Sequence, residues 1–220
     1  MAYYQRGQFT TPPVVKNLLI VNVLVFLTQM LLPPTAKHWV METLSLNFWV
    51  GGTFQGYQLI TYMFLHANLS HLFFNMFALW MFGRILEYDL GSRRFFIFYM
   101  ICGIGAGLVQ LGVNWIEYAS FIGSGYAAVQ FPGMSTIGAS GAIFGVLLGY
   151  GMMHPNSPIY FLFIPVPIKA KWFVIGYGVV ELFAGIGGSA SGVAHYAHVA
   201  GMLFGFLLLY LWKRQGKIYY

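Results

Sequence analysis

The chain has 220 residues, of which 59% are hydrophobic and only 7% are charged. Soluble domains carry roughly 25% charged residues, so this composition excludes a water-soluble globular protein and indicates an integral membrane protein. The net charge of +6 does not indicate a nucleic-acid partner, because the basic residues are placed as membrane topology requires. Each span needs about 20 apolar residues, so the length fits one all-α polytopic domain over residues 1–220, embedded in a lipid bilayer.

Six apolar segments follow one another along the chain, and each is expected to form a membrane-spanning helix. The first ends at Pro33-Pro34, and the residues before it lack the pattern of a cleaved signal peptide. Residues 35–56 mix polar and aromatic side chains, which is typical of a long loop in the membrane interface. Residues 159–167 are apolar but short and broken by prolines, so we expect a loop packed on the protein. The expected helices cover about residues 14–32, 68–87, 95–113, 135–153, 171–186 and 194–212.

The basic residues predict the orientation of these helices. Lysine and arginine favour cytoplasmic loops, and only Lys37 falls on the opposite side of the six helices from the others. Both termini are therefore expected in the cytoplasm, and the loops at residues 35–56, 114–132 and 187–192 are expected to face outside. The basic residues assigned to the cytoplasmic side are Arg6, Lys16, Arg84, Arg93, Arg94, Lys169, Lys171, Lys213, Arg214 and Lys217.

A serine and a histidine lie inside two of the expected spans. Ser140 is about eight residues from the break at Pro132, and His198 is about six residues from Gly192. At about 1.5 Å per helical residue, both side chains lie roughly 10 Å below the outer membrane surface. Polar groups in hydrocarbon are costly and mark function by default. A serine and a histidine are also the two groups that acyl transfer by an activated hydroxyl needs.

Glycine stripes predict that the fourth and sixth helices meet. Small residues on one helix face allow two backbones to approach closely in lipid. Such a contact would bring the His198 imidazole within reach of the Ser140 hydroxyl. The stripes are Gly141, Gly145 and Gly149 on the fourth helix, and Gly201 and Gly205 on the face of the sixth helix that carries His198.

The second helix adds two polar groups at the same shallow depth. His71 and Asn75 are four residues apart and share one helix face. Ser140 lies in the first turn of the fourth helix, where backbone N–H groups have no intrahelical acceptor. Together these N–H groups and side chains predict an oxyanion hole. Gly138 leaves room for a substrate backbone beside the serine.

Three motifs in this order resemble those of the rhomboid family of intramembrane serine proteases. They are His66-Ala67-Asn68-Leu69-Ser70-His71-Leu72-Phe73-Phe74-Asn75, then Gly138-Ala139-Ser140-Gly141, then His198 with Gly201 and Gly205. The resemblance covers nearly the whole chain. It implies a six-helix core that cleaves transmembrane protein substrates near the outer membrane face without a cofactor. Many relatives have Trp-Arg or Trp-Gln in the first loop, where this chain has Tyr57-Gln58.

The resemblance also assigns roles to residues. It implies that Ser140 is the nucleophile, that His198 is the base, and that His71, Asn75 and the Ser140 N–H hold the oxyanion. His66 matches a histidine with a structural role. The fifth helix and its neighbouring outer loop are implied to gate substrate entry.

Other polar residues of the expected spans have simpler interpretations. We interpret His195 as an outer-mouth or structural residue, and Glu181 as a structural hydrogen-bond partner of a neighbouring helix. No aspartate is positioned to orient His198, so the sequence predicts a dyad. In that hypothesis, packing or the hydroxyl of a nearby tyrosine holds the imidazole.

Two other classes of protein stay open at this stage. One is a non-catalytic rhomboid-like protein that binds membrane clients. The other is a metal-dependent membrane protein that uses the histidines, although the HExxH pattern is absent and no carboxylate is expected to join them. The small core without a seventh helix or a targeting peptide predicts the bacterial inner membrane. The histidines of the metal hypothesis are His66, His71, His195 and His198.

Overall fold

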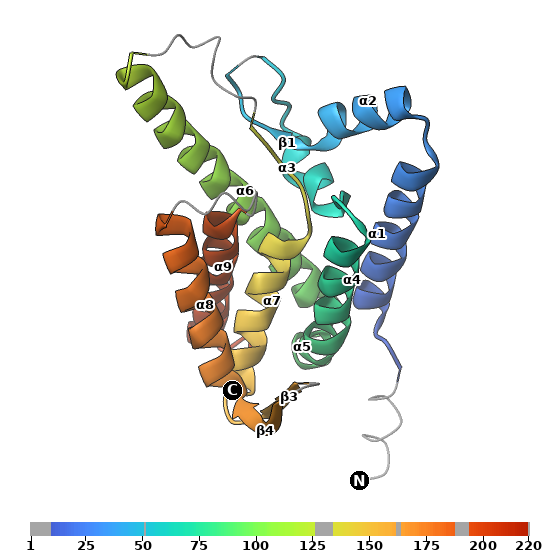
Figure 1. Cartoon of the computed structure of the whole chain (residues 1–220). Coiled ribbons are helices and arrows are strands. Elements are labelled where there is room, and N and C mark those ends of the chain that lie inside the picture. The colour runs from blue at the N-terminus through green and yellow to red at the C-terminus, as the bar shows by residue number, and fades with distance from the viewer. Residues whose placement is uncertain (1–9, 51, 126–133, 162–163, 188–193, 220) are drawn as a thin grey trace.

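A computed structural model describes residues 10–50, 52–125, 134–161, 164–187 and 194–219. Arg6, Pro132 and Gly192, which entered the topology and depth arguments, lie outside these ranges. The described chain is mostly helical (Figure 1). In chain order its helices are α1 (Pro13–Leu31), α2 (Pro34–Leu44), α3 (Gln58–Thr61), α4 (Leu69–Ala78), α5 (Arg84–Leu90), α6 (Ser92–Gly123), α7 (Ser140–Met153), α8 (Ala170–Ile186) and α9 (His195–Arg214).

Short elements complete the fold. A 3-10 turn, η1 (Tyr62–Phe64), follows α3, and a π-helical turn, η2 (Leu79–Gly83), joins α4 to α5. Strands β1 (Leu46–Asn47) and β2 (Ser135–Thr136) pair antiparallel, as do β3 (Pro158–Phe161) and β4 (Ile164–Lys169).

Four helical segments of the described chain are long and apolar enough to cross a membrane. They are α1, the continuous rod from α4 to α5, α6 and α9. Helix α7 is apolar but has only 14 residues, which corresponds to about 21 Å of helix. The composition and these helices make the chain a multi-pass integral membrane protein.

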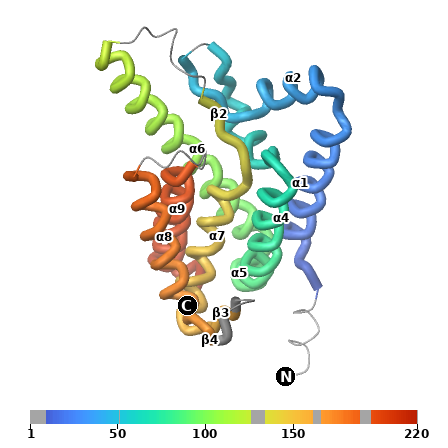
Figure 2. Tube along the Cα trace, viewed as in Figure 1, coloured from blue at the N-terminus to red at the C-terminus, as the bar shows by residue number. Residues whose placement is uncertain are grey.

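Helix α7 lies at the centre of the bundle, next to α4, α8 and α9 (Figures 1 and 2). The contact between α7 and α9 is a backbone contact. A methyl group on Gly201 would overlap the carbonyl oxygen of Gly141, and one on Gly205 would lie 3.2 Å from the carbonyl oxygen of Gly145. Glycine at these positions therefore fixes how closely the first turns of α7 and α9 approach.

Three elements differ from the sequence predictions. Helix α7 begins at Ser140 rather than near residue 135, because Ser135 and Thr136 are extended and pair with the first loop. Helix α6 continues to Gly123 instead of ending near residue 113, since residues 114–122 contain no proline or glycine to stop it. The prolines of residues 159–167 do not prevent a hairpin, because both strands of a two-stranded sheet are edge strands, where proline is tolerated.

The first loop also contains regular structure. Helix α2 forms within the region predicted to be a long interfacial loop, and Pro34 occupies its first turn, where a missing N–H costs nothing. After α2, strand β1 leads the chain down to α3.

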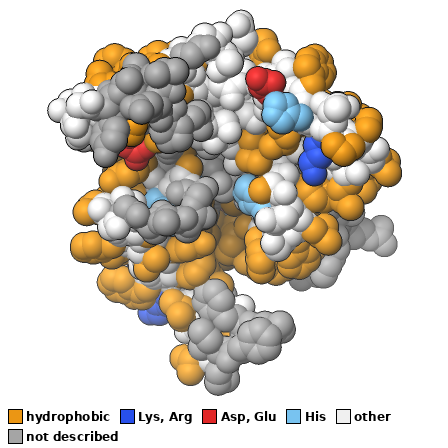
Figure 3. All heavy atoms as spheres, turned by 45° about the horizontal axis from the view of Figure 1, so that its top comes forward, with side chains coloured by type: hydrophobic (Ala, Val, Ile, Leu, Met, Phe, Trp, Pro, Cys, Tyr) orange, Lys and Arg blue, Asp and Glu red, His pale blue; other side chains and the backbone are white. Residues whose placement is uncertain are grey.

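The two ends of the bundle carry different elements (Figure 1). Helices α2 and α3 and strands β1 and β2 lie at the end where α7 begins, whereas α5, β3, β4 and the end of α9 lie at the other. Among the described lysines and arginines, only Lys37 belongs to the first end. Figure 3 looks toward this first end and shows histidine side chains within a mostly hydrophobic and uncharged surface.

Candidate active site

Ser140 and His198 are in direct contact. Ser140 is the first residue of α7, and His198 lies in the first turn of α9. Ser140 Oγ and His198 Nε2 are 2.7 Å apart, which is hydrogen-bond distance. The close approach of α7 and α9 at their glycines places both side chains at the same level, although 58 residues separate them in the chain.

The turn before α7 depends on Gly138. Its φ is +121°, a conformation that residues with a side chain rarely adopt. A Cβ here would also lie 2.8 Å from Cε1 of His71 and 3.8 Å from Ser140 Oγ. Gly138 thus allows the chain to turn into α7 while its backbone passes directly beside the serine and His71.

The His198 imidazole is held on its face and at its second nitrogen. Its ring stacks on Phe144, with ring centroids 4.2 Å apart and planes inclined by 8°. Its Nδ1 lies 2.9 Å from Oε2 of Glu181 on α8. The sequence prediction that the imidazole is held without an acid is therefore wrong.

Glu181 has a second histidine partner. Its Oε2 also lies 2.7 Å from Nδ1 of His195, one turn before His198 on α9. Glu181 is only 6% exposed. The hydrogen bond from Glu181 to a neighbouring helix is present, but its partners are two imidazoles rather than inert packing groups. A carboxyl in an apolar helix, with two histidines spaced i, i+3 on a later helix, was the signal in the sequence.

This cluster also changes the metal hypothesis. The ligand atoms of Glu181, His195 and His198 lie within 4.8 Å of one another, close enough for a metal ion. A carboxylate does join the histidines, contrary to the prediction, while His66 and His71 are outside this group.

His71 and Asn75 lie on the opposite side of Ser140, on α4. Both line a cavity of about 650 Å³ together with Ser140 and His198. The backbone N–H of Ala67 donates to Nδ1 of His71 over 3.4 Å, so the ring proton is on Nε2, the nitrogen beside Gly138. Nδ2 of Asn75 is buried and has no hydrogen-bond partner among the described residues. Both residues that line this cavity with Ser140 thus carry a side-chain N–H donor.

His66 is close to this cavity but does not line it. The residue is 2% exposed, and its ring meets that of His71 edge to face, with centroids 5.0 Å apart. Gln29 of α1 bonds both the N–H and the carbonyl of His66. His66 therefore packs behind His71.

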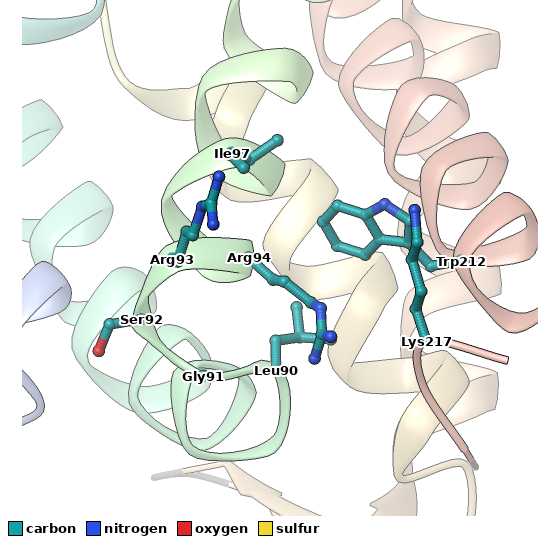
Figure 4. Close-up of a pocket in the computed structure, with 8 residues that line it drawn as sticks. All are labelled: Leu90, Gly91, Ser92, Arg93, Arg94, Ile97, Trp212 and Lys217. Carbon is teal, nitrogen blue, oxygen red and sulfur yellow. The ribbon is translucent and has the colours of Figure 1, made fainter. Parts of the chain in front are cut away.

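A second cavity, of about 470 Å³, is associated with the start of α6 and the end of α9 (Figure 4). Among its described lining residues the only serine is Ser92, whose hydroxyl donates to Glu87, and none is a histidine. Ser140, His198 and the unpartnered amide nitrogen of Asn75 belong instead to residues that line the first cavity. The chain is thus a multi-pass membrane protein with a cavity lined by a serine and histidines.

A family model described as the Rhomboid domain matches residues 53–215, and the chain belongs to the rhomboid family. It is 31% identical over 156 residues to the mitochondrial Rhomboid protein 1 of Saccharomyces cerevisiae, covering 68% of this chain and 39% of the relative. It is 29% identical over 176 residues to the chloroplastic Rhomboid-like protein 11 of Arabidopsis thaliana, covering 70% of this chain and 52% of that protein. It is 29% identical over 153 residues to the Rhomboid protease GluP of Bacillus subtilis, covering 68% and 25%. The chain thus spans between a quarter and about half of the length of these relatives.

Proposed function

We propose that this chain is an intramembrane serine endopeptidase that cleaves transmembrane-anchored protein substrates. The observation that carries the proposal is the 2.7 Å contact between Ser140 Oγ and His198 Nε2 inside a cavity. Family membership supports it, because GluP of Bacillus subtilis bears the name of a rhomboid protease.

The proposed reaction is acyl transfer through serine. His198 accepts the hydroxyl proton through Nε2 as Ser140 Oγ attacks the peptide carbonyl, and then gives that proton to the leaving amine. Water hydrolyses the acyl-enzyme with the same base. His71 Nε2–H, Asn75 Nδ2–H and the Ser140 backbone N–H are the proposed donors to the oxyanion. The buried Asn75 donor without a described partner supports this role, because an unpaired buried N–H costs about 1–3 kcal/mol.

The proposed membrane arrangement is a six-helix core with both termini in the cytoplasm. Helices α7 and α8 are the shorter spans, and the end that carries α2, β1 and β2 faces outside. The basic residues at the other end support this orientation. A span of only 14 residues in α7 supports a nucleophile below the outer surface, because its first residue is Ser140. We propose the bacterial inner membrane as the location.

Substrate must reach Ser140 from within the bilayer. A helical peptide bond is shielded by its own hydrogen bonds and side chains, so the substrate has to unwind locally near the cavity. We propose that α8 and the outer loop that follows it gate this entry, since α8 contributes Tyr177 and Glu181 to the cavity lining. Helix-destabilising residues in the substrate would then favour cleavage.

The test combines cleavage with active-site labelling. The detergent-purified protein and its Ser140→Ala variant are incubated with a model transmembrane substrate, or with a serine-directed fluorophosphonate. We expect wild type to cleave and label, and the variant to do neither. Wild type that does neither supports a client-binding protein, and an alanine variant that cleaves equally well excludes Ser140 as nucleophile. Loss of cleavage in chelator would support the metal-dependent class.

A further inference from the structure

Three side chains from three helices form a continuous chain of hydrogen bonds. Ser140 on α7 contacts His198 on α9 at 2.7 Å, and His198 contacts Glu181 on α8 at 2.9 Å. The two contacts use opposite nitrogens of one imidazole. We propose that Glu181 is a positioning residue for catalysis, so that the site works as a Ser140–His198–Glu181 triad. This inference rests on the proposed protease function.

The two histidine contacts of Glu181 indicate its protonation state. Oε2 lies within 2.9 Å of a ring nitrogen of both His195 and His198. A carboxylate oxygen can accept from two N–H donors at once, so the ionised form bonds both rings in the same tautomer, whereas a protonated oxygen would have to donate to one ring and accept from the other. In our proposal Glu181 is ionised and accepts from both Nδ1–H groups.

This arrangement fixes the tautomer that the mechanism needs. A neutral imidazole carries its proton on either nitrogen, and the partner of one nitrogen decides which. With Nδ1–H directed at Glu181, the lone pair of Nε2 is directed at the Ser140 hydroxyl. Stacking on Phe144 fixes the plane of the ring but cannot choose between the tautomers, because a phenyl ring neither donates nor accepts in that plane.

Glu181 also stabilises the charge that forms on His198. When Nε2 takes the serine proton, an imidazolium forms in a site where Glu181 and His198 are both more than nine-tenths buried. An adjacent carboxylate offsets the cost of that charge, which is high in a low-dielectric interior. Serine loses its proton to His198, and Glu181 stays ionised throughout.

The location of Glu181 on α8 links the base to the proposed gate. Ser140 and His198 are held together by the backbone contact of α7 with α9, but the carboxylate comes from a different helix. If α8 moves away to admit a substrate, His198 loses its acceptor until α8 returns. The triad would therefore be complete only when α8 is packed on α9.

The experiment replaces Glu181 in the full-length, detergent-purified protein. Glu181→Gln keeps the size and removes the charge, and Glu181→Asp keeps the charge on a shorter side chain. Glu87→Gln is the matched control, since it makes the same change at another buried carboxylate. For each variant we measure kcat and KM on the transmembrane substrate, the fluorophosphonate labelling rate, and thermal unfolding.

We expect Glu181→Gln to lower kcat and the labelling rate together, on the order of 10²- to 10⁴-fold, with little change in KM. Glu181→Asp should recover part of both, and Glu87→Gln should change neither. If wild type and Glu181→Gln have equal kcat and labelling rates and the variant only melts at a lower temperature, Glu181 stabilises the contact of α8 with α9 and does not position His198. If Glu181→Gln does not fold, a Glu181→Asp variant no more active than Glu181→Ala overturns the proposal. Wild type that neither labels nor cleaves overturns the protease function itself.

Discussion

Two glutamates are buried in this apolar bundle, and they have different kinds of partner. Glu87, at the end of the bundle away from Ser140, is 1% exposed and accepts from the backbone N–H groups of Val14 and Val15 at 3.0 and 2.7 Å. Its Oε1 also accepts from the Ser92 hydroxyl at 2.7 Å. Glu181, which lines the Ser140 cavity, bonds the imidazoles of His195 and His198.

The difference shows how to separate a structural carboxylate from a functional one. Glu87 satisfies orphan N–H groups in the first turn of α1, and its negative charge suits the positive end of that helix. Those donors are fixed and cannot change state. The partners of Glu181 can change tautomer and charge, and one of them, His198, contacts the proposed nucleophile Ser140. The identity of the partner, rather than the depth of burial, therefore assigns the role.

The largest effect is expected when His198 is replaced. His198→Gln removes the proposed base and should lower kcat by roughly 10⁴-fold or more. If Glu181 acts through His198, adding Glu181→Gln to His198→Gln should cost almost nothing further, because residues that act as a unit are not additive. The kcat of the two single variants and of the double variant measures this coupling. A second full loss in the double variant would show that Glu181 acts independently of His198.

Asn75 presents a third kind of buried polar group, one whose proposed partner exists only during the reaction. Asn75→Ala should lower kcat on the order of 10²- to 10³-fold, as removal of an oxyanion donor does. It should not lower thermal stability, because the deleted Nδ2 has no described partner to lose. Asn22→Ala is the control, since its Nδ2 donates within α1 to Leu18. Asn75→Ala that unfolds early but retains kcat would contradict the oxyanion role.

At Glu87 the expected effect is on stability alone. Glu87→Ala leaves two N–H groups of α1 without their acceptor, at a cost of about 1–3 kcal/mol for each unsatisfied group. The melting temperature should fall, while the fluorophosphonate labelling rate per folded molecule should match wild type. Labelling at a temperature well below unfolding separates the two quantities. A slower rate in fully folded Glu87→Ala would mean that this carboxylate, too, influences the active site.

The sequence predicts some of this arrangement because certain residues carry local information. Glycine stripes on two helices indicate which backbones can touch, and Ser140 and His198 lie at matching levels on those helices. These features depend on spacing within one segment, and spacing can be read directly.

The contact of Glu181 with His198 is hard to predict from sequence because it depends on the rotation of one helix relative to another. Residues 187–194 separate α8 from α9, and apolar residues surround Glu181 on α8, so no periodicity shows which face meets α9. The predicted end of α6 is wrong because composition and helix propensity disagree there. Asn114 and Glu117 look like loop residues in an apolar pattern, yet helix formation depends on local propensity and continues beyond the apolar part.

The smallest effect is expected at His195, which contacts Glu181 but not Ser140. His195→Gln removes one of the two imidazoles at the Glu181 carboxylate and leaves the His198 contact in place, so we expect kcat to fall much less than in Glu181→Gln. Comparing kcat of His195→Gln and Glu181→Gln in the same cleavage assay shows whether catalysis depends on the bond of Glu181 to His195 or on its bond to His198. If both bonds serve only to tie α8 to α9, the two variants should be impaired equally. A much larger loss in Glu181→Gln is the result that a tautomer-fixing carboxylate requires, because only that variant changes the group facing Nδ1 of His198.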